Sequence, residues 1–113
     1  MYIALDDVSV VNIAFPSIQL VRNPSFENSS STPVGWTRWC ASECSPGTAG
    51  SVENDDCRTN RCFLSECGGG GVEFIAQGFA ATIGQVYNIS FWTQRVRYSS
   101  SSMSAVNLYA GIL

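Results

Sequence analysis

Five cysteines, Cys40, Cys44, Cys57, Cys62 and Cys67, are the residues of this sequence best suited to chemistry. Their spacing matches neither the paired C-x-x-C of zinc ribbons nor a redox C-x-x-C motif. In a small chain rich in Gly and Ser, it favours disulfides in an oxidising compartment over a cysteine-only zinc site. We expect Cys62 to pair with Cys67, and Cys57 with Cys44 or Cys40. Because five is odd, one thiol is free or pairs with another chain, and Cys40 is the candidate for an inter-chain disulfide.

Residues for acid–base or nucleophilic catalysis are sparse. The sequence contains no histidine, so the commonest general base and the commonest transition-metal ligand are absent. A serine nucleophile would therefore lack its ordinary base. Carboxylate pairs such as Glu43/Glu53 and Asp55/Asp56 do not indicate glycosidase chemistry without a known separation. We therefore expect that the protein is not an enzyme.

The composition is that of one small globular domain. The 113 residues are 45% apolar and 13% charged, with a net charge of -3, which is too apolar for disorder. The six basic residues are scattered among acids, so nucleic-acid binding is not expected. No stretch reaches the length of a membrane span, and the first residues do not resemble a signal peptide. A secreted form would have lost its signal or have it upstream in a longer precursor.

A two-residue period of apolar and polar side chains predicts strands through most of the chain. It is clearest at residues 85–98, where Tyr87, Ile89 and Phe91 share one face. The same pattern predicts strands in four further segments, residues 9–17, 17–27, 71–79 and 103–113. Ser-rich and Gly-rich loops separate them, and no segment sustains a helical stripe. Short strands with turns between them predict an all-β sandwich or jelly roll.

Several motifs together resemble one superfamily. They are N-P-S-F-E at residues 23–27, G-W at residues 35–36, the stretch at residues 74–94 that contains G-x-x-Y-x-x-S-F-W, and the D-D-V in residues 2–10. They resemble the jelly-roll modules of the galactose-binding-like superfamily, which includes carbohydrate-binding modules and extracellular repeat proteins. The resemblance covers most of the chain and implies a jelly-roll fold. It is weak for function, because such modules serve as sugar binders, adhesins and spacers.

The resemblance also suggests two kinds of site. Asp6, Asp7 and Glu27 correspond to positions where similar modules often hold a structural calcium, a cation that carboxylates and backbone carbonyls suit; otherwise these residues only cap strand ends in water. No other cofactor is expected. Tryptophans stack on sugar rings in carbohydrate-binding modules. Trp39, beside the cysteine-rich loop, is the candidate for that role, whereas Trp36 and Trp92 fall where the family places core aromatics.

The sequence departs from the family pattern in strand order, because the D-D-V strand, last in the family, precedes N-P-S-F-E here. The sequence therefore resembles one repeat unit whose boundaries do not coincide with those of the folded domain, so that the last strand of the domain comes first in the chain. We expect residues 1–11 to be a closing strand donated to a neighbouring copy, residues 12–18 a short linker, and residues 19–113 a jelly-roll body that lacks its last strand. Core positions of the donated strand are Ile3, Leu5, Val8 and Val10.

Two N-x-Ser/Thr triplets predict glycosylation of a secreted chain, at Asn28 in a Ser-rich loop and at Asn88 on the polar face of its strand. The function expected from the sequence is a non-catalytic repeat unit of an extracellular filament, with copies of itself as partners. The copies would join head to tail by strand donation or as a covalent tandem array. A self-contained monomer, and a carbohydrate-binding module of a larger secreted protein or adhesin that recognises glycans, are the alternatives.

Overall fold

The computed structural model describes residues 2–40, 50–55, 57–65, 73–96 and 108–112, which form strands, turns and extended segments without a helix. Accordingly, this part of the chain has no helix of the length and apolar character needed to cross a membrane. The strands are β1 (Tyr2–Asn12), β2 (Thr37–Cys40), β3 (Ser51–Glu53), β4 (Cys62–Leu64), β5 (Glu73–Ala76) and β6 (Tyr87–Val96). The all-β class predicted from the sequence is confirmed.

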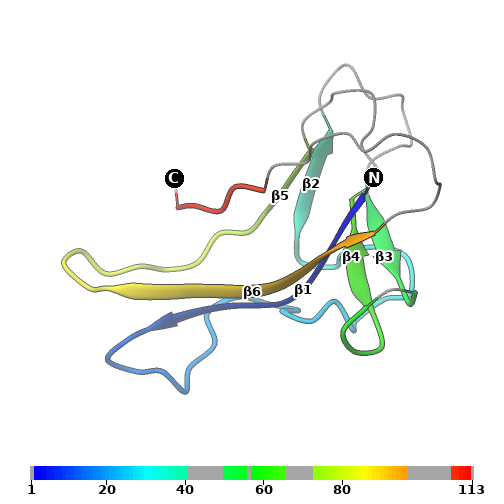
Figure 1. The fold of residues 1–113 in the computed structure, drawn as a ribbon. Coiled ribbons are helices and arrows are strands. Elements are labelled where there is room, and N and C mark those ends of the chain that lie inside the picture. The colour runs from blue at the N-terminus through cyan, green and yellow to red at the C-terminus, as the bar shows by residue number, and fades with distance from the viewer. Residues whose placement is uncertain (1, 41–49, 56, 66–72, 97–107, 113) are drawn as a thin grey trace.

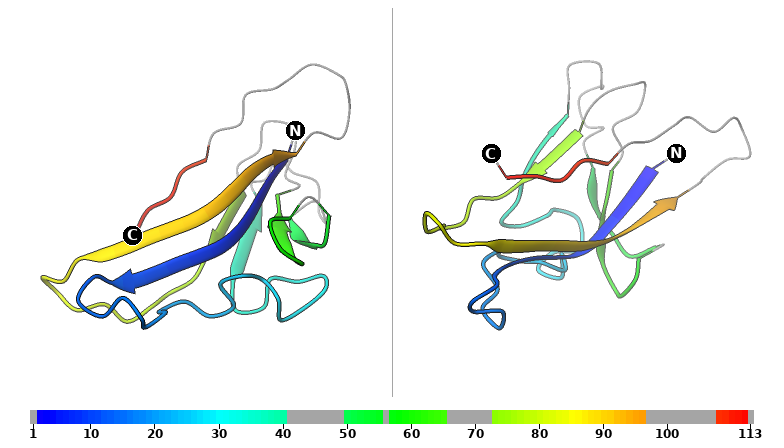
Figure 2. Two further views of the ribbon diagram at one scale, coloured as in Figure 1. Left: turned by 60° about the horizontal axis from the view of Figure 1, so that its bottom comes forward. Right: turned by 60° about the vertical axis from the view of Figure 1, so that its left-hand side comes forward.

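The strands form two antiparallel sheets (Figure 1). The larger has the order β3-β4-β1-β6, and the smaller pairs β2 with β5. The β1–β6 pair is the longest, and it runs as a ribbon away from the short strands (Figure 2). Ile75 of β5 and the nearby Trp36 pack against the core of the larger sheet, which gives the molecule a sandwich-like arrangement.

A β-bulge in β1 divides the strand into two halves. Asp6 lies opposite Trp92 and Ser9 opposite Ser90, so two residues of β1 oppose one residue of β6 between these pairs. Asp7, in the bulge, has a φ of 48°. A bulge of this kind leaves one residue unpaired and bends the strand.

The bulge changes which core cluster the side chains of β1 contact. Val8 and Val10 are buried, as the sequence predicts, but Ile3 and Leu5 are only half-buried and Ala4 is fully buried instead. The even-numbered residues from Ala4 to Val10 are all buried, but Ala4 belongs to one core cluster, whereas Leu5 and Val8, on either side of the bulge, contact another.

The core has one cluster on each face of the larger sheet. One contains Ala4, Cys62, Leu64 and Val96, with Trp92 packed against it. The other contains Val8, Phe26, Val52 and Phe63. The Phe26 ring is fully buried, with its centroid 5.7 Å from that of Trp36 and 6.0 Å from that of Phe63. Aromatic rings at such separations add about 0.5–1.5 kcal/mol per pair beyond their burial.

The disulfide pairings predicted from the sequence, Cys62 with Cys67 and Cys57 with Cys44 or Cys40, are both wrong. Cys62 bonds Cys57, with the two Cα atoms 5.5 Å apart, and not Cys67. Cys62 is fully buried in β4, and the turn at residues 58–61 brings Cys57 back against the core cluster that contains Cys62. The side chains of Cys40, Cys44 and Cys67 lie outside the described residues.

The strand predicted at residues 17–27 is also wrong, since these residues form turns and irregular backbone. Asn23 and Phe26 both have positive φ, of 48° and 57°, which breaks an extended strand. Within residues 103–113 only residues 108–112 are described, and they form no strand. The strands predicted at residues 71–79 and 85–98 are confirmed in β5 and β6.

β1 is paired within its own chain, between β4 and β6. The sequence predicted its donation to another copy, whereas the structure holds the closed arrangement. Closure is achieved because the loop at residues 13–18 reverses the chain, so that the Leu20 N–H donates to the Val10 carbonyl at 3.0 Å. An exchanged strand would make the same pairings with another copy.

Candidate functional site

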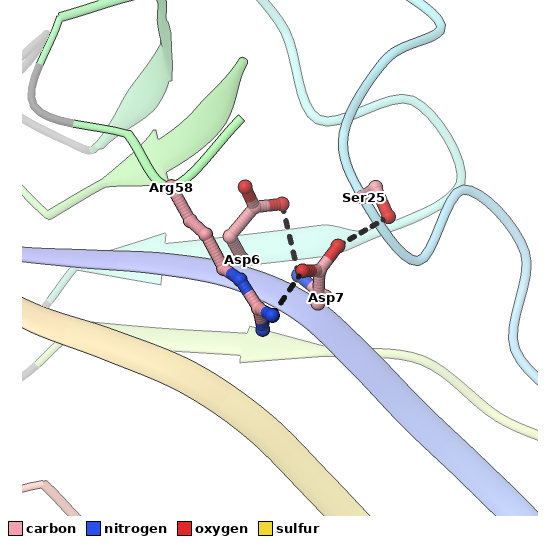
Figure 3. Close-up of polar contacts among 4 residues, drawn as sticks. All are labelled: Asp6, Asp7, Ser25 and Arg58. Carbon is pink, nitrogen blue, oxygen red and sulfur yellow. Dashed lines mark hydrogen bonds and ion pairs between the residues drawn. The ribbon is translucent and has the colours of Figure 1, made fainter. Parts of the chain in front are cut away.

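The bulge of β1 buries one carboxylate and presents a second (Figure 3). The Asp6 side chain is fully buried, and its Oδ1 accepts a hydrogen bond from the Asp7 N–H at 2.8 Å. Its Oδ2 is buried and accepts no hydrogen bond of ordinary geometry, and the Thr59 N–H near the carboxyl compensates its charge only in part. A buried carboxylate oxygen without a partner is costly, so this atom is the least satisfied polar group of the described core.

Asp7 points toward solvent and connects three segments of the chain. Its Oδ1 accepts a hydrogen bond from the Ser25 hydroxyl at 2.8 Å, and its Oδ2 lies 3.5 Å from the Arg58 guanidinium. Both members of that ion pair are partly exposed, so solvent screens it and it contributes little stability. The Asp7 carboxylate thus joins β1 to the N-P-S-F-E turn and to the disulfide loop.

The N-P-S-F-E motif is a turn that carries Glu27 to this region. Asn23 organises it: its carbonyl accepts from the Trp36 indole N–H at 3.1 Å, and its amide group donates to the Val34 carbonyl at 2.9 Å. The turn joins β1 through the Val8 N–H, which donates to the Pro24 carbonyl at 2.9 Å. Glu27 is then placed beside the disulfide loop, where its Oε1 accepts from the Arg61 N–H at 3.2 Å.

Burial raises the pKa of Asp6 above its ordinary value. The negative charges of Asp7 and Glu27 act in the same direction, while backbone N–H groups of Asp7 and Thr59 oppose it. Desolvation is the largest cause, because the charged form of a buried carboxyl loses its hydration. The site therefore favours either a proton or a cation at Asp6.

The structure brings Asp6, Asp7 and Glu27 of one chain to the same region. Within the described residues, however, no three carboxylate or cysteine side chains are arranged to hold a metal ion between them. Asp7 and Glu27 are engaged by Ser25, Arg58 and Arg61. The unpartnered Asp6 Oδ2 is the feature that suits a hard cation, whose remaining ligands would have to include backbone carbonyls.

A second feature is an exposed aromatic pair on the smaller sheet. Trp39 of β2 lies opposite Phe74 of β5, with stacked rings whose centroids are 5.4 Å apart. The two residues are 53% and 55% exposed, so their outer surfaces face solvent. Trp36 packs against the core, as predicted. The sequence identified Trp39 but missed Phe74, whose cross-strand position depends on the β2–β5 register.

The two predicted glycosylation sites, Asn28 and Asn88, are both exposed. Asn28 follows the N-P-S-F-E turn, and Asn88 lies in β6 opposite Val11. Ser25 and Arg58, which hold Asp7, were not identified from the sequence, because their roles arise from contacts between segments distant in the chain.

Comparisons with known proteins identify no family for this chain. No protein-family model, no curated protein and no solved structure matches it.

Proposed function

We propose that this chain is a non-catalytic structural repeat of an extracellular, glycosylated filament, in which a jelly-roll body is completed by the D-D-V strand of a neighbouring copy. The copies join either by strand donation or as a covalent tandem array. Secretion is supported by the Cys57–Cys62 disulfide, and glycosylation by the exposure of Asn28 and Asn88.

The observation that carries the proposal is the inner position of β1. This N-terminal strand pairs with β4 on one side and β6 on the other, and it contributes Ala4, Val8 and Val10 to the core. Without it, both neighbouring strands would expose unpaired backbone groups. Each well-buried valine contributes about 1.5–3 kcal/mol, so a body without β1 strongly favours acquiring an identical strand.

The connection to β1 permits either arrangement. Residues 13–18 reverse direction in the closed form, and when extended they span about 20 Å. Because an exchanged strand would make the same contacts, the closed and exchanged forms differ mainly in the loop and in any new contact between copies. Head-to-tail exchange does not close on itself, so it propagates as a fibre.

The molar mass of the native protein tests the proposal. We expect light scattering to show particles far heavier than one chain, with mass rising with protein concentration. After enzymatic removal of N-glycans, a mass of 12.2 kDa in denaturing and reducing conditions would identify strand donation, and a multiple of it a tandem array. Deglycosylated protein of 12.2 kDa, from native particles that contain only one chain each, would contradict both forms of assembly.

We propose in addition that a structural calcium ion binds at Asp6. The support is its buried, unpartnered Oδ2 beside Asp7 and Glu27. A bound cation would compensate the buried negative charge and join β1 to the N-P-S-F-E turn.

A second candidate function, glycan binding as a carbohydrate-binding module, is favoured by the Trp39–Phe74 pair. Two stacked, half-exposed rings form a flat apolar surface of the kind on which a sugar ring packs. We expect Trp39→Ala to weaken binding to an insoluble polysaccharide about tenfold, because a substantial apolar contact is lost.

A pull-down series with several polysaccharides measures this effect. Tyr109→Ala serves as the control, since Tyr109 is an exposed aromatic residue, at 87%, that belongs neither to the pair nor to any other proposed contact surface. Absence of binding by the unmodified protein, or equal loss in both variants, would remove this candidate.

A further inference from the structure

The far end of the β1–β6 ribbon carries an exposed apolar surface, which we call the apolar tip. It consists of Ile13, Phe15, Ile18, Ile83 and Val86, which are 58%, 60%, 54%, 101% and 60% exposed. The first three lie in the loop that follows β1, and the other two in the segment that precedes β6 (Figure 2). Five large apolar side chains exposed together usually mark an interaction surface.

The two segments of the apolar tip are joined to each other. The Ile13 N–H donates to the Val86 carbonyl at 3.0 Å, and the Asn12 amide group donates to Gln85 Oε1 at 3.3 Å. Each segment also contains its own turn, closed by Phe15 N–H to the Asn12 carbonyl and by Gln85 N–H to the Thr82 carbonyl. In the closed chain, these hydrogen bonds therefore hold the two segments of the apolar tip side by side.

Charge is absent from this part of the chain. Residues 8–21 and 74–94 contain no Asp, Glu, Lys or Arg, although the whole sequence has fifteen such residues, six basic and nine acidic. A surface without charge is suited to an apolar partner. The apolar tip of a second copy is such a partner, because packing the two tips together buries no charged side chain.

Chain length identifies which surface lies within reach. β1 ends at Asn12, which lies opposite Tyr87 beside the apolar tip. After the loop at residues 13–18, the Gln19 side chain contacts Ser9 and Val10 near the end of the same strand. If β1 completes one copy while Gln19 belongs to the next, residues 13–18 join the ends of the two ribbons. Their extended length of about 20 Å is then the greatest separation of the two ends. This holds for strand donation and for a tandem array alike.

We propose that the apolar tip is the contact surface between neighbouring copies, with residues 13–18 as the link that crosses it and the tip of the next copy as its occupant. This inference rests on the proposed assembly and adds to it the residues through which the bodies touch. In the assembly Phe15 and Ile83 are covered by the neighbouring tip, whereas in the closed single chain they face solvent.

Hydroxyl-radical labelling of the full chain, read by mass spectrometry, tests this contact. The assembled and single-chain fractions are separated by size before labelling. We expect Phe15 and Ile83 to be labelled less in the assembly than in the single chain, while Phe74, 55% exposed outside the tip, is labelled equally in both. Ile83→Ser is expected to raise the concentration at which half the protein assembles by about tenfold or more, and the control Phe74→Ser is expected to leave it unchanged.

The outcomes separate this inference from the assembly itself. Assembly with unchanged labelling of Phe15 and Ile83 would overturn the tip contact and leave the assembly standing. Failure to assemble at any concentration would overturn both. Protection of the tip by phosphatidylcholine vesicles but not by assembly would identify a lipid surface as the occupant, and would also overturn the proposal.

Discussion

Deletion of residues 14–17 is expected to convert closed chains into assembled ones. The deletion leaves Ile13 and Ile18 to reverse the chain between Asn12 and Gln19. Two-residue reversals of this kind use positive φ, which β-branched residues resist, so the closed form becomes strained while the exchanged form requires no reversal. Light scattering at matched concentrations should show mass moving almost entirely into the assembled fraction.

The opposite change supplies the control. Insertion of about six Gly/Ser residues after Ala14 relaxes the loop and should favour the closed single chain, because a flexible link lets β1 return to its own sheet at small entropic cost. Both variants retain every residue of β1 and of the core. The shortened variant lacks Phe15 and so loses part of the apolar tip, but Ile13, Ile18, Ile83 and Val86 remain, and the strain of the short loop is expected to outweigh that loss. Equal assembly of the shortened, lengthened and unmodified proteins would show that this loop does not govern strand exchange.

Asp6→Asn is expected to have opposite effects on stability with and without calcium. Without calcium at pH 7, the variant should unfold with a free energy about 1 kcal/mol higher, because it removes a buried charge that has an unpartnered oxygen. With calcium in excess, the unmodified protein should become the more stable, since a ligand at 100 times its Kd adds about 2.7 kcal/mol.

The pH dependence of stability without calcium follows from the raised pKa of Asp6. In the folded state this carboxyl retains its proton to a higher pH than in the unfolded state, so folding takes up a proton between the two pKa values. Its contribution is therefore most favourable below pH 3.8, the ordinary value, and falls as pH rises through the folded pKa. Asp6→Asn should remove this decline.

Thermal unfolding with calcium chloride or with a chelator, from pH 3 to pH 8, measures both effects. Asp55→Asn is the matched control, because Asp55 is an exposed carboxylate and should change neither the calcium response nor the pH profile. An unchanged unfolding temperature of the unmodified protein in calcium would eliminate the calcium site. A calcium response that Asp6→Asn retains would place the ion elsewhere.

The strands whose pattern is local could be predicted from the sequence. β6 follows from the alternation of Tyr87, Ile89 and Phe91 with polar residues, because successive side chains of a strand point to opposite faces of the sheet. β5 was found in the same way. The strand predicted at residues 17–27 was wrong because Asn23 and Phe26 have positive φ. That conformation is held by tertiary contacts, such as the hydrogen bond from the Trp36 indole to the Asn23 carbonyl, which the local sequence pattern does not show.

The sites depended on contacts that spacing does not encode. Cysteine spacing could not show that Cys62 is buried in β4 beside Cys57, so the predicted partner was wrong. The resemblance suggested Asp6 and Glu27 as residues of a calcium site, but it did not indicate the bulge beside Asp6. Phe74 became part of an aromatic surface only through its register with Trp39, which is a non-local property of the β2–β5 pair.

Supply of β1 from a neighbouring copy is the central claim, and contacts between chains of different isotopic composition test it most directly. Labelled and unlabelled chains would be refolded together, assembled, and examined by NMR for contacts restricted to labelled–unlabelled pairs. The claim predicts such contacts between Leu5 and Thr93 and between Val10 and Ile89, which face each other across the β1–β6 pair. Contacts found only within single chains, in assembled material whose chains have a mass of 12.2 kDa, would contradict it.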